Sequence, residues 1–267
     1  MLPVVALAVT ACSASPTSGT SAPPTGAARL VVRSTPTVVT AASAAKPLAG
    51  RVVVIDPGHN LGNSRHAAQI GRLVNAGGSR KPCNTTGTAT ASGYPEATFA
   101  WSVATYLKAR LVAQGATVYL TRSSNSASAW GPCVDVRGRF GNTVHADAVV
   151  SVHADGTASR FHGFFAIRPA RKQGWTDDIY TGSGRLALDV RAGLQAAGLP
   201  RANYNGGDGL DTRGDLGTLN WSNVPTVMVE LGNMKNATDA AHMRSASWRD
   251  SVYAAGLARG LATFLRR

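Results

Sequence analysis

Short runs of apolar, mostly β-branched residues alternate with helix-like segments from residue 51 to the end of the chain. Alternation of this kind is typical of an α/β domain in which the sheet is largely parallel. The expected strands cover 51–55, 116–120, 148–152, 163–167 and 226–231. The expected helices cover 95–113, 134–145, 183–197 and 248–265. Such a sheet binds ligands at the carboxyl ends of its strands, so the residues that follow the runs are the first place to look for a site.

Two stretches between these elements lack any periodic pattern. Residues 60–93 are rich in Gly, Asn, Ser and Thr, which predicts a long loop, and loops of that length in a compact domain are usually functional. Residues 204–217 are rich in Gly but contain no Gly-Lys-Ser/Thr, which argues against a phosphate loop and favours a loop that lines a substrate site.

The N-terminal part has a different composition from the rest. The first fifty residues contain no Asp or Glu, and the Ser/Thr/Pro/Ala-rich residues 13–49 predict a disordered linker ahead of a catalytic domain at 50–267. Residues 1–12 hold a short apolar run that leads to Cys12 and resembles the lipobox of bacterial lipoproteins. We therefore expect export, with Cys12 as a candidate for lipidation. The alternative is an ordinary cleaved signal peptide in which Cys12 follows small residues by chance.

The remaining cysteines are Cys83 and Cys133. In an exported protein they are candidates for a disulfide, although free thiols or metal ligands stay open as alternatives. Neither cysteine has a CxxC partner, which disfavours a cysteine zinc site. A disulfide that closes a loop of this length would stabilise the fold by about 4 kcal/mol in the chain-entropy model.

The chain is strongly basic, with 27 Lys and Arg against 14 Asp and Glu, a net charge of +13. The basic residues are scattered and no aromatic-basic motif accompanies them, so nucleic-acid binding is disfavoured. Attraction to an anionic polymer outside the cell fits the charge better, and solubility alone is the third interpretation.

Four acid or imidazole side chains follow or flank the expected elements. His59 lies in IDPGH, Glu96 in GYPEATF, His153 in SVHAD and Glu230 in VELGN. Two His and one carboxylate form a common catalytic zinc set, and a further carboxylate beside it can act as a general base. Each His could instead be a hydrogen-bonded structural residue, and Glu96 could serve only to favour the helix dipole. Glu230 is harder to explain in that way, because an unpaired charge within an apolar strand is costly.

These motifs, in this order, resemble the zinc-dependent N-acetylmuramoyl-L-alanine amidases of the amidase-3 (AmiC-like) family. The resemblance covers Arg51 to the C-terminus, and Cys83 with Gly-Pro-Cys133 fits the compact single-domain type with a disulfide. It implies an α/β fold with a mixed, largely parallel, twisted sheet of about six strands flanked by helices. It also implies one zinc ion held by His59, Glu96 and His153, with Glu230 as the catalytic residue.

The activity implied by the resemblance is hydrolysis, by zinc-activated water, of the amide between the lactyl group of N-acetylmuramic acid and L-Ala of the peptidoglycan stem peptide. Such an enzyme would act in cell-wall turnover or cell separation on peptidoglycan or muropeptide fragments. We expect an exported monomer that meets a membrane only through a lipid anchor. The alternatives are a non-catalytic module that binds the wall, a zinc peptidase that cuts crosslinks, and a divalent metal other than zinc.

Four further residues are candidates for supporting the site. Asp56 and Asp155 adjoin the two His motifs and could orient the ligands, or could serve only as turn or cap residues. Arg213 could meet a carboxylate of the stem peptide, and Asn233 could contact substrate or belong to a turn. The sequence marks Arg122 and Arg137 as structural residues.

Overall fold

The β-branched runs form the centre of a six-stranded sheet in the computed structural model, which describes residues 46–267. The strands follow the order β4 (Thr117–Leu120), β1 (Val52–Pro57), β5 (Ala148–Asp155), β8 (Thr226–Asn233), β6 (Phe165–Pro169) and β7 (Leu210–Arg213). The first four are parallel, β6 is antiparallel to β8, and β7 is parallel to β6. This mixed, largely parallel sheet confirms the predicted fold class. The predicted signal segment, the linker and Cys12 lie outside the described residues.

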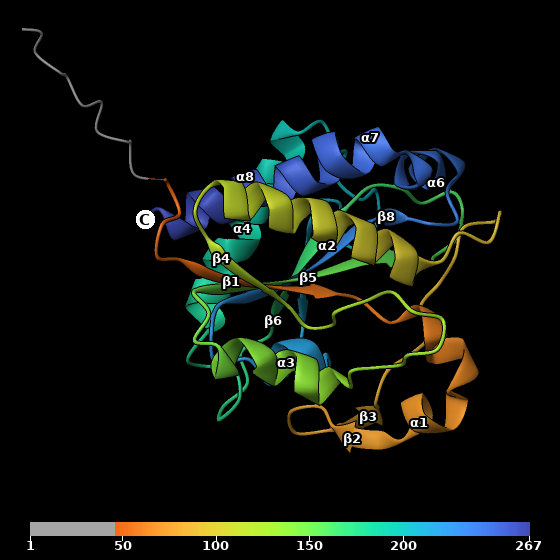
Figure 1. The fold of residues 1–267 in the computed structure, drawn as a ribbon, viewed down its shortest axis with the longest axis horizontal. Helices are drawn as coiled ribbons and strands as arrows, with labels where there is room; N and C mark the ends of the chain where they lie inside the picture. The colour runs from red at the N-terminus through yellow and green to blue at the C-terminus, as the bar shows by residue number, and fades with distance from the viewer. Residues whose placement is uncertain (1–45) are drawn as a thin grey trace, which may run out of the picture. The chain divides into compact units, whose positions relative to one another are not determined.

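Helices cover both faces of the sheet (Figure 1). The long helix α2 (Glu96–Ala113) packs on one face, and its buried side chains share a single apolar core with α4 (Tyr180–Ala196) and α8 (Ala255–Leu265). On the other face lie α3 (Val134–Thr143) and the short α5 (Gly217–Asn220). Since β1, β5 and β8 are buried on both faces, their sequences are nearly continuous apolar runs.

The C-terminal region is more divided than the sequence predicts. Helical structure covers the whole predicted range 248–265, but as α7 (Ala246–Trp248), a π-helical segment η2 (Arg249–Ala254) and then α8, and an additional helix, α6 (Ala237–Arg244), precedes them. Asn236 explains the start of α6, because its side chain accepts hydrogen bonds from two backbone amides of the first turn. Among the described residues, no helix combines the length and the apolar character needed to cross a bilayer.

The expected loop at 60–93 contains regular structure, which corrects the prediction. It holds η1 (Leu61–Arg65), α1 (Ala67–Gly71) and a hairpin of β2 (Leu73–Asn75) with β3 (Arg80–Pro82). The strands of the hairpin are three residues long and largely exposed, so they carry no apolar alternation that a sequence pattern could reveal. Tertiary contacts hold the hairpin instead, including a hydrogen bond of 2.7 Å from the Trp221 indole N–H to the Asn75 carbonyl.

The predicted disulfide is present between Cys83 and Cys133, fifty residues apart in sequence. Cys83 directly follows β3, and Cys133 is the residue before α3. The bond therefore fastens the hairpin to the helix on the same face of the sheet, and both elements line a cavity at the edge of the sheet.

Candidate metal centre and active-site cavity

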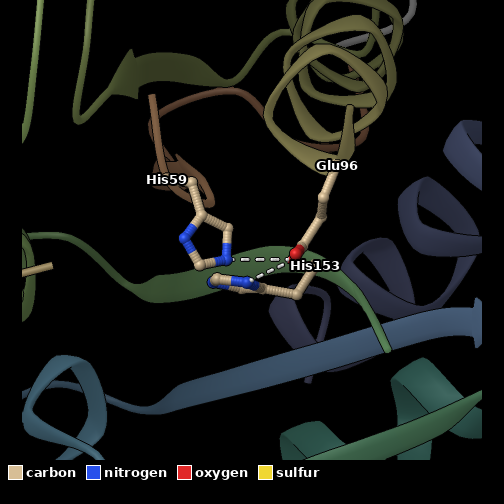
Figure 2. A group of neighbouring side chains, drawn as sticks. All are labelled: His59, Glu96 and His153. Carbon is tan, nitrogen blue, oxygen red and sulfur yellow. Dashed lines mark hydrogen bonds and ion pairs between the residues drawn. The ribbon is translucent and has the colours of Figure 1, made fainter. Parts of the chain in front are cut away.

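Three side chains meet at the carboxyl edge of the sheet, as the sequence predicts. His59 follows β1, Glu96 is the first residue of α2 and His153 lies near the end of β5. Glu96 Oε1 is 3.1 Å from His59 Nε2 and 2.9 Å from His153 Nδ1. Figure 2 shows both nitrogens directed at this one oxygen. One potential ligand atom from each residue lies within 4.8 Å of the others, so the three form a candidate metal centre.

The backbone that carries His59 approaches the His153 ring closely. A Cβ on Gly58 would lie 2.4 Å from the imidazole of His153, which only glycine avoids at this position. His59 itself has a φ of 55°, in the left-handed region that non-glycine residues seldom adopt. The His59 Nδ1 lies 3.1 Å from the Thr85 carbonyl oxygen. A hydrogen on Nδ1, donated to this carbonyl, would leave the Nε2 lone pair free to bind a metal at the shared centre.

Two buried arginines donate hydrogen bonds to the backbone around His59. Arg137 donates to the carbonyl oxygens of Pro57 and His59, at 2.8 and 2.6 Å, and pairs with Asp56 at 2.5 Å. Arg122 donates to the Pro57 carbonyl at 3.0 Å and to the Ala97 carbonyl at 2.8 Å. The arginines therefore join the end of β1 to the start of α2. The structure confirms that Arg122 and Arg137 have a structural role.

Asp56 supports the centre through Arg137 and not by direct contact with an imidazole. Its carboxylate also accepts hydrogen bonds from the hydroxyls of Ser151 and Thr121. Burial alone would raise the pKa of Asp56, but the Arg137 guanidinium and the two hydroxyl donors outweigh burial and lower the pKa to about 2. Asp56 is thus ionised at neutral pH and neutralises a guanidinium that is equally buried.

The second oxygen of Glu96 is also engaged. Oε2 accepts the backbone N–H of Thr88 at 2.9 Å, while Oε1 accepts that of Ala154 at 3.2 Å. A Cβ on Gly87, whose φ is 75°, would lie 2.8 Å from Oε2, so this turn also requires glycine. Burial would raise the pKa of Glu96, but the two neighbouring imidazoles lower it. The carboxylate therefore presents a fixed negative charge between the two His rings.

Glu230 lies on β8 opposite His153, its register partner on β5. Its Oε2 is buried and has no hydrogen-bond partner among the described residues. Burial, followed by the charges of Glu96 and Asp155, raises the pKa of Glu230 well above its usual value, and Arg213 opposes this shift. A carboxyl group with a raised pKa and an unengaged oxygen is a candidate for proton transfer.

A cavity of about 390 Å³ connects these groups. It reaches from the His and Glu side chains, past Met228 of β8, to the hairpin and the loop before α5. Both apolar and ionisable side chains line it, and the ionisable ones are His59, Lys81, Glu96, Arg137, His153, Asp155, Asp215 and Glu230.

The remaining candidates lie in different surroundings. Asp155 lines the cavity and accepts a hydrogen bond of 2.9 Å from the Tyr204 hydroxyl. Asn233 is fully buried, and its amide donates to the carbonyls of Ala158 and Phe161, so it anchors a loop. Arg213 forms a bidentate pair with Asp215, at 2.8 and 2.9 Å, and is not among the residues that line the cavity.

Sequence reasoning did not identify Lys81, which lines the cavity, or Tyr204, whose hydroxyl donates to the cavity-lining Asp155. Lys81 belongs to the hairpin that was expected to be a loop, and Tyr204 stands alone in a Gly-rich stretch. Neither residue type signals a site without neighbours that only the fold supplies. In the part of the chain that the structure describes, His59, Glu96 and His153 are the one group of three or more potential ligands, and no other histidine joins it.

Comparison with known proteins agrees with this geometry. The family model described as N-acetylmuramoyl-L-alanine amidase, Amidase_3, matches residues 53–263. A curated N-acetylmuramoyl-L-alanine amidase of Mycobacterium tuberculosis is 44% identical over 238 residues, which cover 88% of this chain and 95% of that protein.

Solved structures extend the likeness to three dimensions. The crystal structure of the N-acetylmuramyl-L-alanine amidase Ami1 from Mycobacterium smegmatis has a TM-score of 0.76 and 40% identity, covering 82% of this chain and 98% of its own. The crystal structure of the apo form of Ami1 from Mycobacterium abscessus has a TM-score of 0.76 and 41% identity, covering 81% of this chain and 99% of its own. Four motifs, one sheet topology and a family match over most of the chain place this protein in the amidase-3 family of N-acetylmuramoyl-L-alanine amidases.

Proposed function

We propose that this chain hydrolyses the amide between the lactyl group of N-acetylmuramic acid and L-Ala of the peptidoglycan stem peptide. In this proposal His59, Glu96 and His153 hold one zinc ion, and Glu230 is the catalytic residue. The observation that carries it is the convergence of three donor atoms within 4.8 Å, beside a carboxylate whose Oε2 is buried without a partner.

The donor set suits zinc in kind and in orientation. Two imidazole nitrogens and a carboxylate oxygen are the protein ligands of many catalytic zinc sites. Contacts with Thr85 and Thr88 engage the outer atoms of His59 and Glu96, which leaves Nε2 and Oε1 directed at the centre. Zinc held there would supply a Lewis acid that polarises the substrate carbonyl and lowers the pKa of water to about 7.

Glu230 would move the proton that the reaction requires. Its free oxygen can accept a proton from the attacking water and deliver it to the nitrogen of L-Ala as the amide bond breaks. The raised pKa of Glu230 favours holding that proton between the two events. Pairing of β5 with β8 keeps the carboxylate beside His153 throughout.

Three experiments test the proposal: identification of the reaction products, removal and restoration of the metal, and the isosteric substitution of Glu230. Mass spectrometry of digested muropeptides should find free peptides that begin with L-Ala, and chelation should abolish their release until zinc is restored. Glu230→Gln should retain bound metal, while kcat falls by about 10²–10⁴-fold, the usual contribution of a general base.

Other results would assign a different function. Cut crosslinks beside intact lactyl–alanine bonds would identify a peptidase. Retention of full activity after exhaustive chelation would exclude the metal mechanism, and binding without any turnover would identify a wall-binding module.

We also infer export, since peptidoglycan lies outside the cytoplasmic membrane. The disulfide between Cys83 and Cys133 supports an oxidising location. Lipidation of Cys12 can be tested in the expressing bacterium by labelling with a fatty acid, which should mark the wild type and not Cys12→Ser. Equal labelling of both would rule out Cys12 as the anchor.

A further inference from the structure

The outer end of the active-site cavity carries an ion-pair cluster that the proposed chemistry does not use. It consists of Lys81, Arg213 and Asp215, two cations that share one carboxylate. Lys81 Nζ lies 2.6 Å from Asp215 Oδ2, and the Arg213 guanidinium forms its bidentate pair with the same carboxylate. Lys81 and Asp215 both line the cavity, from the hairpin and from the loop between β7 and α5.

The two cations that line the cavity differ in what they can offer a ligand. The Arg137 side chain is 2% exposed and is engaged by Asp56 and by backbone carbonyls. The Lys81 side chain is 39% exposed, and its one hydrogen bond to a described residue goes to Asp215. An ammonium group has three donors, so Lys81 can take a second carboxylate without releasing the first.

The charged groups of the cavity also differ between its inner and outer ends. The carboxyl groups of Glu96, Asp155 and Glu230 line the inner end, whereas the three residues of the cluster at the outer end carry a net charge of +1. In the substrate, the lactyl carboxyl group is consumed in the amide bond that is cut. The carboxylates that remain on a muramoyl peptide therefore all belong to the peptide.

We propose that Lys81 binds a carboxylate of the stem peptide, so that the peptide runs from the metal centre toward the hairpin. The sequence suggested Arg213 for such a contact, but Lys81 lines the cavity and Arg213 does not. This inference rests on the proposed function and adds to it the direction and charge preference of substrate binding.

The hairpin holds Lys81 in place for this purpose. The next residue but one, Cys83, is bonded to Cys133, and the Asn220 amide donates to the Ala76 carbonyl at 2.9 Å. Loss of the Lys81 ammonium leaves the Arg213–Asp215 pair intact. A Lys81 variant should therefore fold normally, which thermal unfolding can verify.

The test compares two substrates that differ only in charge. These are N-acetylmuramoyl-L-Ala-D-Glu with free carboxylates and the same compound with both carboxyls converted to amides. Lys81→Met should raise KM for the free acid by about tenfold, the size of one charge-assisted hydrogen bond, with kcat within about threefold. Lys81→Arg should restore most of this loss, because it keeps the charge.

The diamide and a matched control complete the experiment. On the diamide, Lys81→Met and the wild type should have equal KM. Lys108→Met, the same change on the exposed side of α2, should match the wild type on both substrates. An equal loss on acid and diamide, or no loss on either, would overturn the role of Lys81 and leave the amidase proposal standing. A wild type that releases peptide from neither compound would overturn both.

Discussion

The ion pairs at the two ends of the active-site cavity differ in their exposure to solvent. At the inner end Arg137 and Asp56 form an ion pair whose side chains are 2% and 0% exposed. At the outer end Lys81 and Asp215 form a pair that is 39% and 43% exposed. A buried pair loses its hydration and depends on each partner for charge balance, whereas an exposed pair stays hydrated and can be exchanged.

This difference in exposure suits the two ion pairs to different roles. The buried pair holds the catalytic groups in place, and the exposed pair can bind substrate. The inner pair fixes the carbonyls around His59, whose φ of 55° must be maintained by its surroundings. The outer pair has little structural importance, so a ligand can share its charges at little expense to the fold. Mutations at the inner end should therefore change stability and catalysis together, and mutations at the outer end should change mainly KM.

The largest expected effect comes from breaking the inner pair. Arg137→Met should lower the free energy of unfolding by about 3–5 kcal/mol, because Asp56 would remain buried and uncompensated. Arg213→Met at the outer end should lower it by less than about 1 kcal/mol. Urea unfolding in the presence of a chelator measures both without a contribution from bound metal. Equal losses would mean that burial does not distinguish the two ends.

The pH dependence of stability should distinguish the ends next. The pKa of Asp56 is lowered to about 2 in the folded chain, below the value of 3.8 for an unperturbed group. A lowered pKa adds stability above the unfolded value, and this stability is lost as pH falls through the folded one. Above pH 4, Asp56→Asn should therefore have a free energy of unfolding about 2 kcal/mol below that of wild type because of this linkage. This difference should shrink as pH falls toward 2.

Asp215 is the matched control for that experiment. Hydrogen bonding from Arg213, then from Lys81, also lowers its pKa, against an opposing effect of burial. Because its side chain is 43% exposed, solvent screens these charges, and Asp215→Asn should cost less than about 1 kcal/mol and respond to salt. If the difference in free energy of unfolding between wild type and Asp56→Asn stays constant from pH 5 to pH 3, the proposed linkage is wrong.

The smallest expected effect concerns the hydroxyl that orients Asp155 at the inner end. Tyr204→Phe removes the donor to Asp155 but keeps the ring contacts with Phe161 and Phe165. We expect kcat/KM to fall about fivefold, near 1 kcal/mol, with little change in thermal stability. Tyr119→Phe on the exposed edge strand is the control and should change neither quantity. Unchanged kcat/KM in Tyr204→Phe would show that Asp155 needs no such support.

The sequence predicted the inner end far better than the outer end. Buried strands have continuous apolar runs, and His59, His153 and Glu230 are read directly from the ends of such runs. The outer end depends on a hairpin of three-residue strands and on β7, a short and only partly buried strand. Elements that bury so little apolar surface leave no periodic pattern, so Lys81 could not be linked to Asp215, 134 residues away.

The sequence by itself determined the fold class, the family and the four acid and imidazole side chains, because each follows from a local pattern or a short motif. Tertiary structure alone decided that Arg137 holds the His59 backbone, that Asn233 anchors a loop, and that Lys81 and not Arg213 faces the cavity. The physical reason is that a long polar side chain takes its role from its partners. Those partners come from distant segments that only the folded chain brings within hydrogen-bonding distance.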